Sequence, residues 1–331
     1  MKYSIVITGR DKRPEILQKS SNIYKELIEE GFLKQVIYST GKGCTPKFVK
    51  NNCKDFHISE TEEPILECRL PNGNLCKIHN GRGIGNCWVQ TQQLEHGLSL
   101  VDDPQQSLVL KTRPDVLISK NLIKKVFKSI EGMKVGCEKT GLLNKVWNPW
   151  FDLSKPFYMA DECFAGRATD LQKFINYRFI EYPRHFQGIT HVRRTVEPFL
   201  NTFPALMDYI LAKDDSKHVY ALTSRKRARS ILRGLETESY REYLAAYYFI
   251  LNKYFFIYNR LPEIDFRAWT QNVNNQIISD LNIQTNIEKV PFLIGTFHLG
   301  YDEKFIQNIN SGFFKDDISQ DIYFRIKKYN L

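Results

Sequence analysis

The chain has 331 residues, with 47 Lys and Arg against 37 Asp and Glu, which gives a formal net charge of +10. This length fits about two domains of ~150 residues. With 42% hydrophobic and 13% aromatic residues, the composition excludes a disordered or collagen-like protein. No apolar run reaches the ~18 residues of a membrane span, and the N-terminus lacks the apolar core of a secretion signal. Seven cysteines without a C-x-x-C pair fit reduced thiols, so we expect a cytoplasmic protein.

The beginning of the chain has the pattern of a strand–helix–strand unit. Residues 3–8 are β-rich, and Pro14 and Glu15 suit the first turn of a helix that ends at Gly31. Residues 36–38 form a second β-rich run. This order predicts the α/β fold class, with a mostly parallel, doubly wound sheet that is flanked by helices. Ligands of such a sheet bind beyond the carboxyl ends of its strands.

The later elements are expected from the same kinds of pattern. In chain order we first expect irregular chain or short strands over 42–80, a helix from 86 to about 95 that ends at Gly97, and a strand over 107–111. A helix over 121–130, strands over 134–137 and 157–160, a loop over 161–166 and a further helix are expected next. From about residue 195 we expect a mainly helical chain with a turn at 262–265. We therefore expect an α/β domain over 1–215 and a helical, aromatic-rich region over 216–331.

Two glycine-rich segments fall short of the known phosphate-binding motifs. In Gly81-x-Gly83-x-Gly85 the third glycine has the wrong spacing for a dinucleotide site. The segment 41–45 lacks the four-residue spacer of a P-loop. No two of the seven histidines are three or four residues apart, so there is no helical metal-binding pair. These absences argue against a dinucleotide-binding enzyme, a P-loop enzyme and an enzyme with a helical pair of metal-binding histidines.

The expected strand over 107–111 runs into a charged segment, K-T-R-P-D. A strand end of this kind lies at the edge of the sheet where an α/β fold builds its site. Asp115 can hold a divalent cation through oxygen, and Arg113 and Lys111 can neutralise a diphosphate. The alternative is an ion pair at the strand end followed by a proline turn.

Two further segments combine charge with a turn. Asp161 and Glu162 precede the expected helix, so either can be a general base for a hydroxyl group or a cap of that helix. Arg193 and Arg194 can bind phosphate oxygens with two parallel hydrogen bonds. The alternative places both arginines on a surface turn near Pro183.

The densest basic cluster consists of Arg225, Arg229 and Arg233, which would share one face of a helix. Its interpretations are a solvated face, contact with the head groups of an anionic membrane surface, and contact with nucleic acid. The aromatic stretch 240–258 is expected to be a buried helix, or a surface that faces a membrane. Because these aromatic residues are not interleaved with the basic ones, the pattern argues against nucleic acid.

Together, several segments resemble the WavE-type lipopolysaccharide-synthesis family of GT-A-like glycosyltransferases. They are a helix with Gln90-Thr91 and Gly97-Leu98, the K-T-R-P-D strand end, A-D-E-C-F-A-G-R-A-T-D-L, and H-V-R-R-T-V-E-P-F-L. The similarity spans roughly residues 3–215. It implies a bacterial enzyme with a GT-A-like (Rossmann-like) catalytic domain, cytoplasmic or peripheral on the inner membrane face. That enzyme moves a sugar from a nucleotide-activated donor to a hydroxyl of a lipopolysaccharide or capsule acceptor.

The resemblance also implies roles for particular residues. GT-A enzymes commonly end this strand in Asp-x-Asp, which binds Mn²⁺ or Mg²⁺, but here Arg113 replaces the first acid. Either Asp115 and phosphate oxygens retain the metal, or Arg113 supplies the charge without one. A phosphoryl or nucleotidyl transferase remains the alternative function. The residues expected to bind the donor diphosphate are Lys111, Arg113, Asp115, Arg193 and Arg194. Asp161 is the first choice for the residue that contacts the acceptor or acts as its base, and Glu162 is the second.

Overall fold

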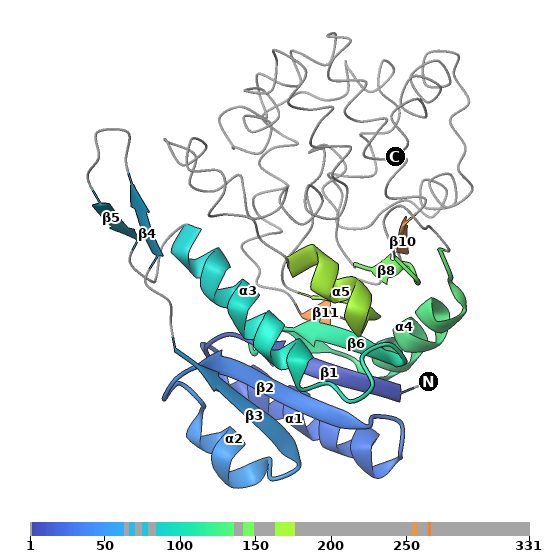
Figure 1. The fold of residues 1–331 in the computed structure, drawn as a ribbon. Helices are drawn as coiled ribbons and strands as arrows, with labels where there is room; N and C mark the ends of the chain where they lie inside the picture. Colours follow the sequence, from blue (N-terminus) through green and yellow to red (C-terminus); the bar gives the residue numbers. More distant parts are fainter. Residues whose placement is uncertain are drawn as a thin grey trace, which may run out of the picture.

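A computed structural model describes residues 2–62, 66–69, 75–78, 84–135, 142–148, 163–175, 254–256 and 264–265. Its centre is a seven-stranded sheet of order β3-β2-β1-β6-β9-β8-β10 (Figure 1). The strands of this sheet are β1 (Lys2–Thr8), β2 (Gln35–Gly41), β3 (Phe56–Thr61), β6 (Ser107–Thr112), β8 (Val146–Trp147), β9 (Phe164–Arg167) and β10 (Phe255–Phe256). The two-stranded sheets pair β4 (Leu66–Arg69) with β5 (Leu75–Ile78), and β7 (Leu117–Ile118) with β11 (Ile264–Asp265).

The large sheet is mostly parallel, as expected. Strands β3, β2, β1 and β6 pair in parallel, and β10 is parallel to β8. Only β9 runs the other way, because it is antiparallel to both β6 and β8. The carboxyl ends of six strands therefore meet at one edge of the sheet, and β9 begins at that same edge.

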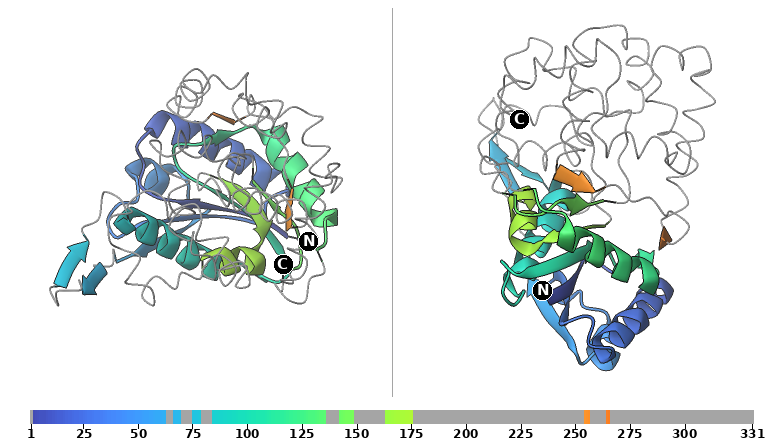
Figure 2. Two further views of the ribbon diagram at one scale, coloured as in Figure 1. Left: turned by 90° about the horizontal axis from the view of Figure 1, so that it is seen from above. Right: turned by 90° about the vertical axis from the view of Figure 1, so that its right-hand side faces the viewer.

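Helices cover both faces of the sheet (Figure 1). They are α1 (Pro14–Glu29), α2 (Lys47–Asn52), α3 (Ile84–Ser99), α4 (Lys120–Gly132) and α5 (Ala168–Ile175). Figure 2 shows α1 and α4 on one side of the sheet and α3 and α5 on the other. The α/β architecture with helices on both faces of the sheet is thus confirmed.

Helix α1 begins and ends where the sequence pattern places it. Pro14 stands at the first helical position and Glu15 in the first turn, where each residue type is favoured. Beyond the last turn, Gly31 has φ +69°, a backbone conformation that favours glycine. Tyr24 and Leu27 are buried against the sheet, and each such burial stabilises the fold by roughly 1.5–3 kcal/mol.

The helix expected from 86 to about 95 is α3. The expectation that it ends at Gly97 is wrong, because α3 continues to Ser99. A Cβ atom at Gly97 would lie 2.5 Å from Val6 Cγ1 and 3.3 Å from Ser39 Cβ. Glycine is therefore needed here for the close approach of α3 to β1 and β2. The Ser39 hydroxyl donates to the Gln93 carbonyl at 2.6 Å and ties the same helix to β2.

Two expectations about strands and one about a helix need correction. Phe164–Arg167 form strand β9, although most of this segment was expected to be loop, because β6 supplies a long-range partner. Lys134 makes only an isolated bridge to Asn144, so a strand does not start there. In the stretch 42–80 the short strands are confirmed, but helix α2 was not expected. The expected strand over 157–160 lies outside the described residues.

Two short strands come from the distant part of the chain. Phe255–Phe256 pair in parallel with β8, although the stretch 240–258 was expected to be helical. Ile264–Asp265 pair with β7, although a turn was expected there. The division at residues 215 and 216 lies outside the described residues and stays a prediction. Among the helices described, none has both the length and the apolar character of a membrane span.

Candidate functional site

The chain changes direction across the sheet at β1. Strand β1 leads through α1 to β2 on one side, and β6 lies on its other side. Such a switch point leaves a crevice beyond the carboxyl ends of the two diverging strands, where ligands bind in α/β sheets. Here the segment 9–13, which follows β1, and the segment 113–116, which follows β6, flank this switch point. A Cβ atom at Gly9 would be 3.7 Å from Pro114 Cδ, so the two segments are neighbours.

Arg113 and Asp115 form a two-bond ion pair at this edge. Arg113 Nε and Nη2 donate to the two carboxylate oxygens of Asp115 at 2.9 and 2.8 Å. The side chains are 19% and 4% exposed, respectively. Paired, planar hydrogen bonds of this kind fix the guanidinium group in one orientation. The Val116 N–H donates to the Arg113 carbonyl at 3.2 Å and closes the turn that holds the pair.

Lys111 lies on β6, two residues before Arg113, and is buried. Its neighbours across the sheet are Val6 on β1 and Phe164 on β9. The Nζ atom is 5.3 Å from the centroid of the Phe164 ring, a distance at which the ring stabilises a cation. The structure therefore brings Lys111, Arg113 and Asp115 together at one strand end, as the sequence predicted.

Sequence reasoning missed the segment after β1 as part of the site. Gly9 has φ +115°, and its N–H donates to the Ser39 carbonyl at 3.2 Å. The Tyr38 hydroxyl donates to the Gly9 carbonyl at 3.3 Å. Asp11 accepts a 2.9 Å hydrogen bond from the Arg13 N–H. The signal for this segment was a glycine followed by four charged residues directly after the first strand.

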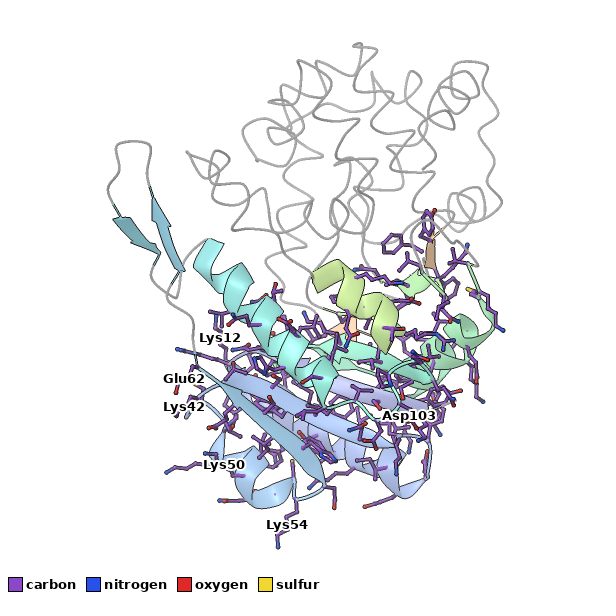
Figure 3. The ribbon with its side chains drawn as sticks, viewed as in Figure 1. Lys12, Lys42, Lys50, Lys54, Glu62 and Asp103 are labelled. Atoms are coloured by element: carbon purple, nitrogen blue, oxygen red, sulfur yellow. The ribbon has the colours of Figure 1, made fainter. Side chains whose placement is uncertain are left out.

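Burial and neighbouring charge raise the pKa of two groups at this edge. Burial raises the pKa of Asp11, opposed by the hydrogen bond from Arg13 N–H and reinforced by the charges of Glu15 and Asp115. Burial also raises the pKa of the Tyr38 hydroxyl, reinforced by Asp11. Figure 3 shows Lys12 and Lys42 at this end of the sheet and Asp103 at the opposite end.

The loop that follows β2 binds a carboxylate of the protein itself, that of Glu60. The Glu60 carboxylate accepts from the Thr45 hydroxyl at 2.5 Å, from the Gly43 N–H at 3.0 Å and from the Thr45 N–H at 3.4 Å. These hydrogen bonds, with the charge of Lys50, lower the pKa of Glu60 to about 2. Because its backbone N–H groups already hold a carboxylate, the segment 41–45 does not act as a P-loop, as the sequence indicated.

Several predicted site residues lie outside the described residues. They are Asp161, Glu162, Arg193 and Arg194, together with the basic cluster Arg225, Arg229 and Arg233. The described chain resumes at Cys163, which is buried, and enters β9 with Phe164 opposite Lys111.

The described residues do not form a site that fits a divalent cation. None of their His, Cys, Asp and Glu side chains gather in a group of three or more. Mg²⁺ and Mn²⁺ prefer oxygen ligands, and the carboxylate at the strand end, Asp115, accepts from Arg113 through both of its oxygens.

No protein-family model matches the sequence, and neither does a curated protein. Among solved structures, 4-diphosphocytidyl-2C-methyl-D-erythritol synthase from Anaerococcus prevotii aligns with 12% identity and a TM-score of 0.33, over 62% of this chain and 84% of that one. An active-site mutant of LgtC aligns with 8% identity and a TM-score of 0.36, over 61% and 70%. S. aureus TarS aligns with 11% identity and a TM-score of 0.35, over 96% and 93%. The candidate site is therefore defined by this chain's own geometry.

Proposed function

We propose that the protein is a glycosyltransferase that moves a sugar from a nucleotide-activated donor to a hydroxyl group of a surface glycan, lipopolysaccharide or capsule. The observation that carries the proposal is the position of the Arg113–Asp115 pair and Lys111 at the β1–β6 switch point. A guanidinium group in a fixed orientation is suited to phosphate oxygens. The switch point is also where α/β sheets bind nucleotides.

In the proposed reaction the bond between the anomeric carbon and the donor phosphate oxygen breaks, and its electron pair leaves with the nucleoside diphosphate. A bond forms between the anomeric carbon and the acceptor oxygen, whose proton passes to a base. Negative charge grows on the departing diphosphate, so fixed positive charge there lowers the barrier. Arg113 supplies that charge, with Lys111 as the second cation.

The acceptor side of the proposal involves residues outside the described part of the chain. Asp161 is the first choice for the base and Glu162 the second. The support is chain connectivity, because Glu162 is bonded to Cys163, which precedes the pair Phe164 and Lys111. Arg193 and Arg194 are proposed to close over the phosphates.

The setting of the enzyme also remains a proposal. We propose a GT-A-like catalytic domain over residues 1–215, with the region 216–331 attached to it. Contact of Arg225, Arg229 and Arg233 with anionic lipid would bring the enzyme to a lipid-linked acceptor on the cytoplasmic membrane face. Flotation with anionic liposomes tests this contact, and absence of binding at low salt contradicts it.

A thermal-shift screen of UDP-, GDP-, CMP- and dTDP-sugars tests the donor site. A ligand at 100 times its Kd adds about 2.7 kcal/mol of stability, which is a readily measured shift. We expect one nucleotide class to stabilise the protein. The double variant Arg113→Met with Asp115→Leu should lose the shift, and the exposed-site control Lys54→Met should keep it. A folded wild-type protein that no nucleotide stabilises contradicts the proposal.

The released product separates this function from a phosphoryl or nucleotidyl transferase that uses the same strand end. A glycosyltransferase releases the nucleoside diphosphate when the donor carries a diphosphate. A nucleotidyl transferase instead releases pyrophosphate, and a phosphosugar transferase releases the nucleoside monophosphate. Chromatography of the released nucleotides, with an assay for pyrophosphate, therefore decides between them.

A further inference from the structure

We infer that the donor site binds its diphosphate without a resident divalent cation, because the Arg113 guanidinium, positioned by Asp115, takes the place of the metal. The inference rests on the proposed function and specifies how the same site meets the charge of its substrate. It assigns Asp115 as a positioning residue rather than a metal ligand.

The geometry of the ion pair is the first argument. Both Asp115 oxygens accept from Arg113, at 2.9 and 2.8 Å. A divalent cation bound to either oxygen would lie about 2.0–2.6 Å from it and therefore directly beside the guanidinium group. Two like charges in a mostly buried site repel strongly. The carboxylate can thus serve the guanidinium or a metal ion, and in this structure it serves the guanidinium.

The neighbouring carboxylate is also engaged by the protein. Asp11 is the acid after β1 that interacts with Asp115, and it accepts from the Arg13 N–H at 2.9 Å. The Arg13 side chain in turn donates to Glu15 at 3.2 Å. The segment 9–13 therefore contains one acid, Asp11, which is hydrogen-bonded within its own loop. The other charged residues of this segment are basic: Arg10, Lys12 and Arg13.

The exposure of the pair shows which partner an anion meets. The Arg113 side chain is 19% exposed and that of Asp115 is 4% exposed. Lys111 adds a second positive charge at the same strand end, with its Nζ atom over the Phe164 ring. The site thus presents fixed positive charge to a diphosphate and keeps its carboxylate behind that charge.

Titration calorimetry with UDP and GDP, in EDTA and in Mn²⁺, tests the inference. We expect the wild-type Kd for the nucleotide that binds to agree within about threefold between the two conditions. Arg113→Asp restores an Asp-x-Asp strand end, so its affinity in EDTA should fall by about 10²-fold and recover at least about tenfold in Mn²⁺. Lys54→Asp makes the same charge change at an exposed position between α2 and β3 (Figure 3) and should bind like wild type in both conditions.

A second readout does not depend on nucleotide. Electron paramagnetic resonance of Mn²⁺ should show the ion unbound with the wild-type protein and bound with Arg113→Asp. Wild-type binding of UDP or GDP only with Mn²⁺, or wild-type binding of Mn²⁺ itself, overturns the inference and leaves the proposed function standing. Absence of nucleotide binding in both conditions overturns the proposed function as well. The wild-type titrations decide these outcomes even where Arg113→Asp does not fold.

Discussion

The two ends of the same sheet use arginine and aspartate in different ways. At the carboxyl end of β6, Arg113 and Asp115 pair with each other across a single turn. At the amino end, Arg167 donates through Nε and Nη2 to the Asn144 side-chain oxygen at 2.9 and 2.7 Å, and through Nη1 to the Gln105 carbonyl. The first pair is local, whereas the second network joins segments that are far apart in the chain.

Asp170 completes the network at the amino end. It is buried and accepts from the N–H groups of Leu143 and Asn144 at 3.0 and 2.9 Å. The Asn144 side chain donates to the Ile130 carbonyl at 3.0 Å, which ties α4 to the same network. Backbone groups are the main partners here, so this cluster holds the fold together. The comparison separates a local ion pair at the switch point, which is a candidate for ligand binding, from a network whose partners hold distant segments of the chain together.

The largest expected effect is at the carboxyl end. Arg113→Met with Asp115→Leu removes both charges and keeps similar volume, a change that is often neutral for stability. Loss of the fixed cation should lower kcat/KM by about 10²–10³-fold. Steady-state kinetics and urea unfolding of the double variant check the two expectations. Near-wild-type turnover by the folded variant would remove the site from catalysis.

At the amino end the expectation is reversed. Asp170→Ala leaves the buried Asn144 N–H and the part-buried Leu143 N–H without their acceptor, which should cost about 2–3 kcal/mol of unfolding free energy. Nucleotide affinity of the folded protein should stay unchanged. Urea unfolding measures the loss, and Asp55→Ala at an exposed position is the control. A stability equal to that of the control would mean that the network does not hold the fold.

Between the two ends lies the contact of α3 with the sheet. Gly97→Ala places a methyl group 2.5 Å from Val6 Cγ1, and the overpacking should destabilise the protein by about 1–3 kcal/mol. Gly132→Ala in α4 is the matched control, because a Cβ atom there meets nothing within 4 Å. Thermal unfolding compares the two variants. Equal stabilities would show that α3 adjusts without cost.

The smallest expected effect is on acid stability. The pKa of Glu60 is lowered from 4.5 to about 2 in the folded protein, so the folded state binds fewer protons than the unfolded state between these values. Glu60 therefore contributes stability that is present above about pH 4.5 and lost as the pH falls toward about 2. Glu60→Gln should flatten this part of the pH–stability curve. An unchanged curve would mean that the loop after β2 does not depend on the carboxylate.

The pKa of Asp170 shifts in the opposite direction. Burial raises it above 3.8, against the hydrogen bonds from Leu143 and Asn144. Stability linked to this group is thus fully present below about pH 3.8 and falls as the pH rises through its folded pKa. The two ends of the sheet consequently differ in the sign of their acid dependence.

The sequence predicted the elements that local pattern defines. Strands β1, β2 and β6 and helix α1 carry apolar runs and helix-start residues that act within a few positions. Strand β9 and Gly97 were misassigned because β6 and the β1–β2 surface, which decide their structure, are distant in the chain. Strands β10 and β11 exist only through pairing with β8 and β7.

The same distinction applies to the candidate site: its local part was predictable from the sequence, and the part that depends on strand pairing was not. Lys111, Arg113 and Asp115 follow one another at a strand end, so their proximity needs no tertiary information. The place of Gly9 and Asp11 beside them depends on the parallel pairing of β1 with β6, which joins segments about a hundred residues apart. Sequence pattern does not contain that pairing, and the topology supplies it.

Hydrogen–deuterium exchange with and without the nucleotide found in the screen tests the central claim most directly. Bound nucleotide should slow exchange in peptides that cover residues 9–13 and 111–116 and leave residues 142–148 unchanged. Such a pattern would place the ligand at the β1–β6 switch point. Nucleotide binding with no added protection in either 9–13 or 111–116 would contradict the account.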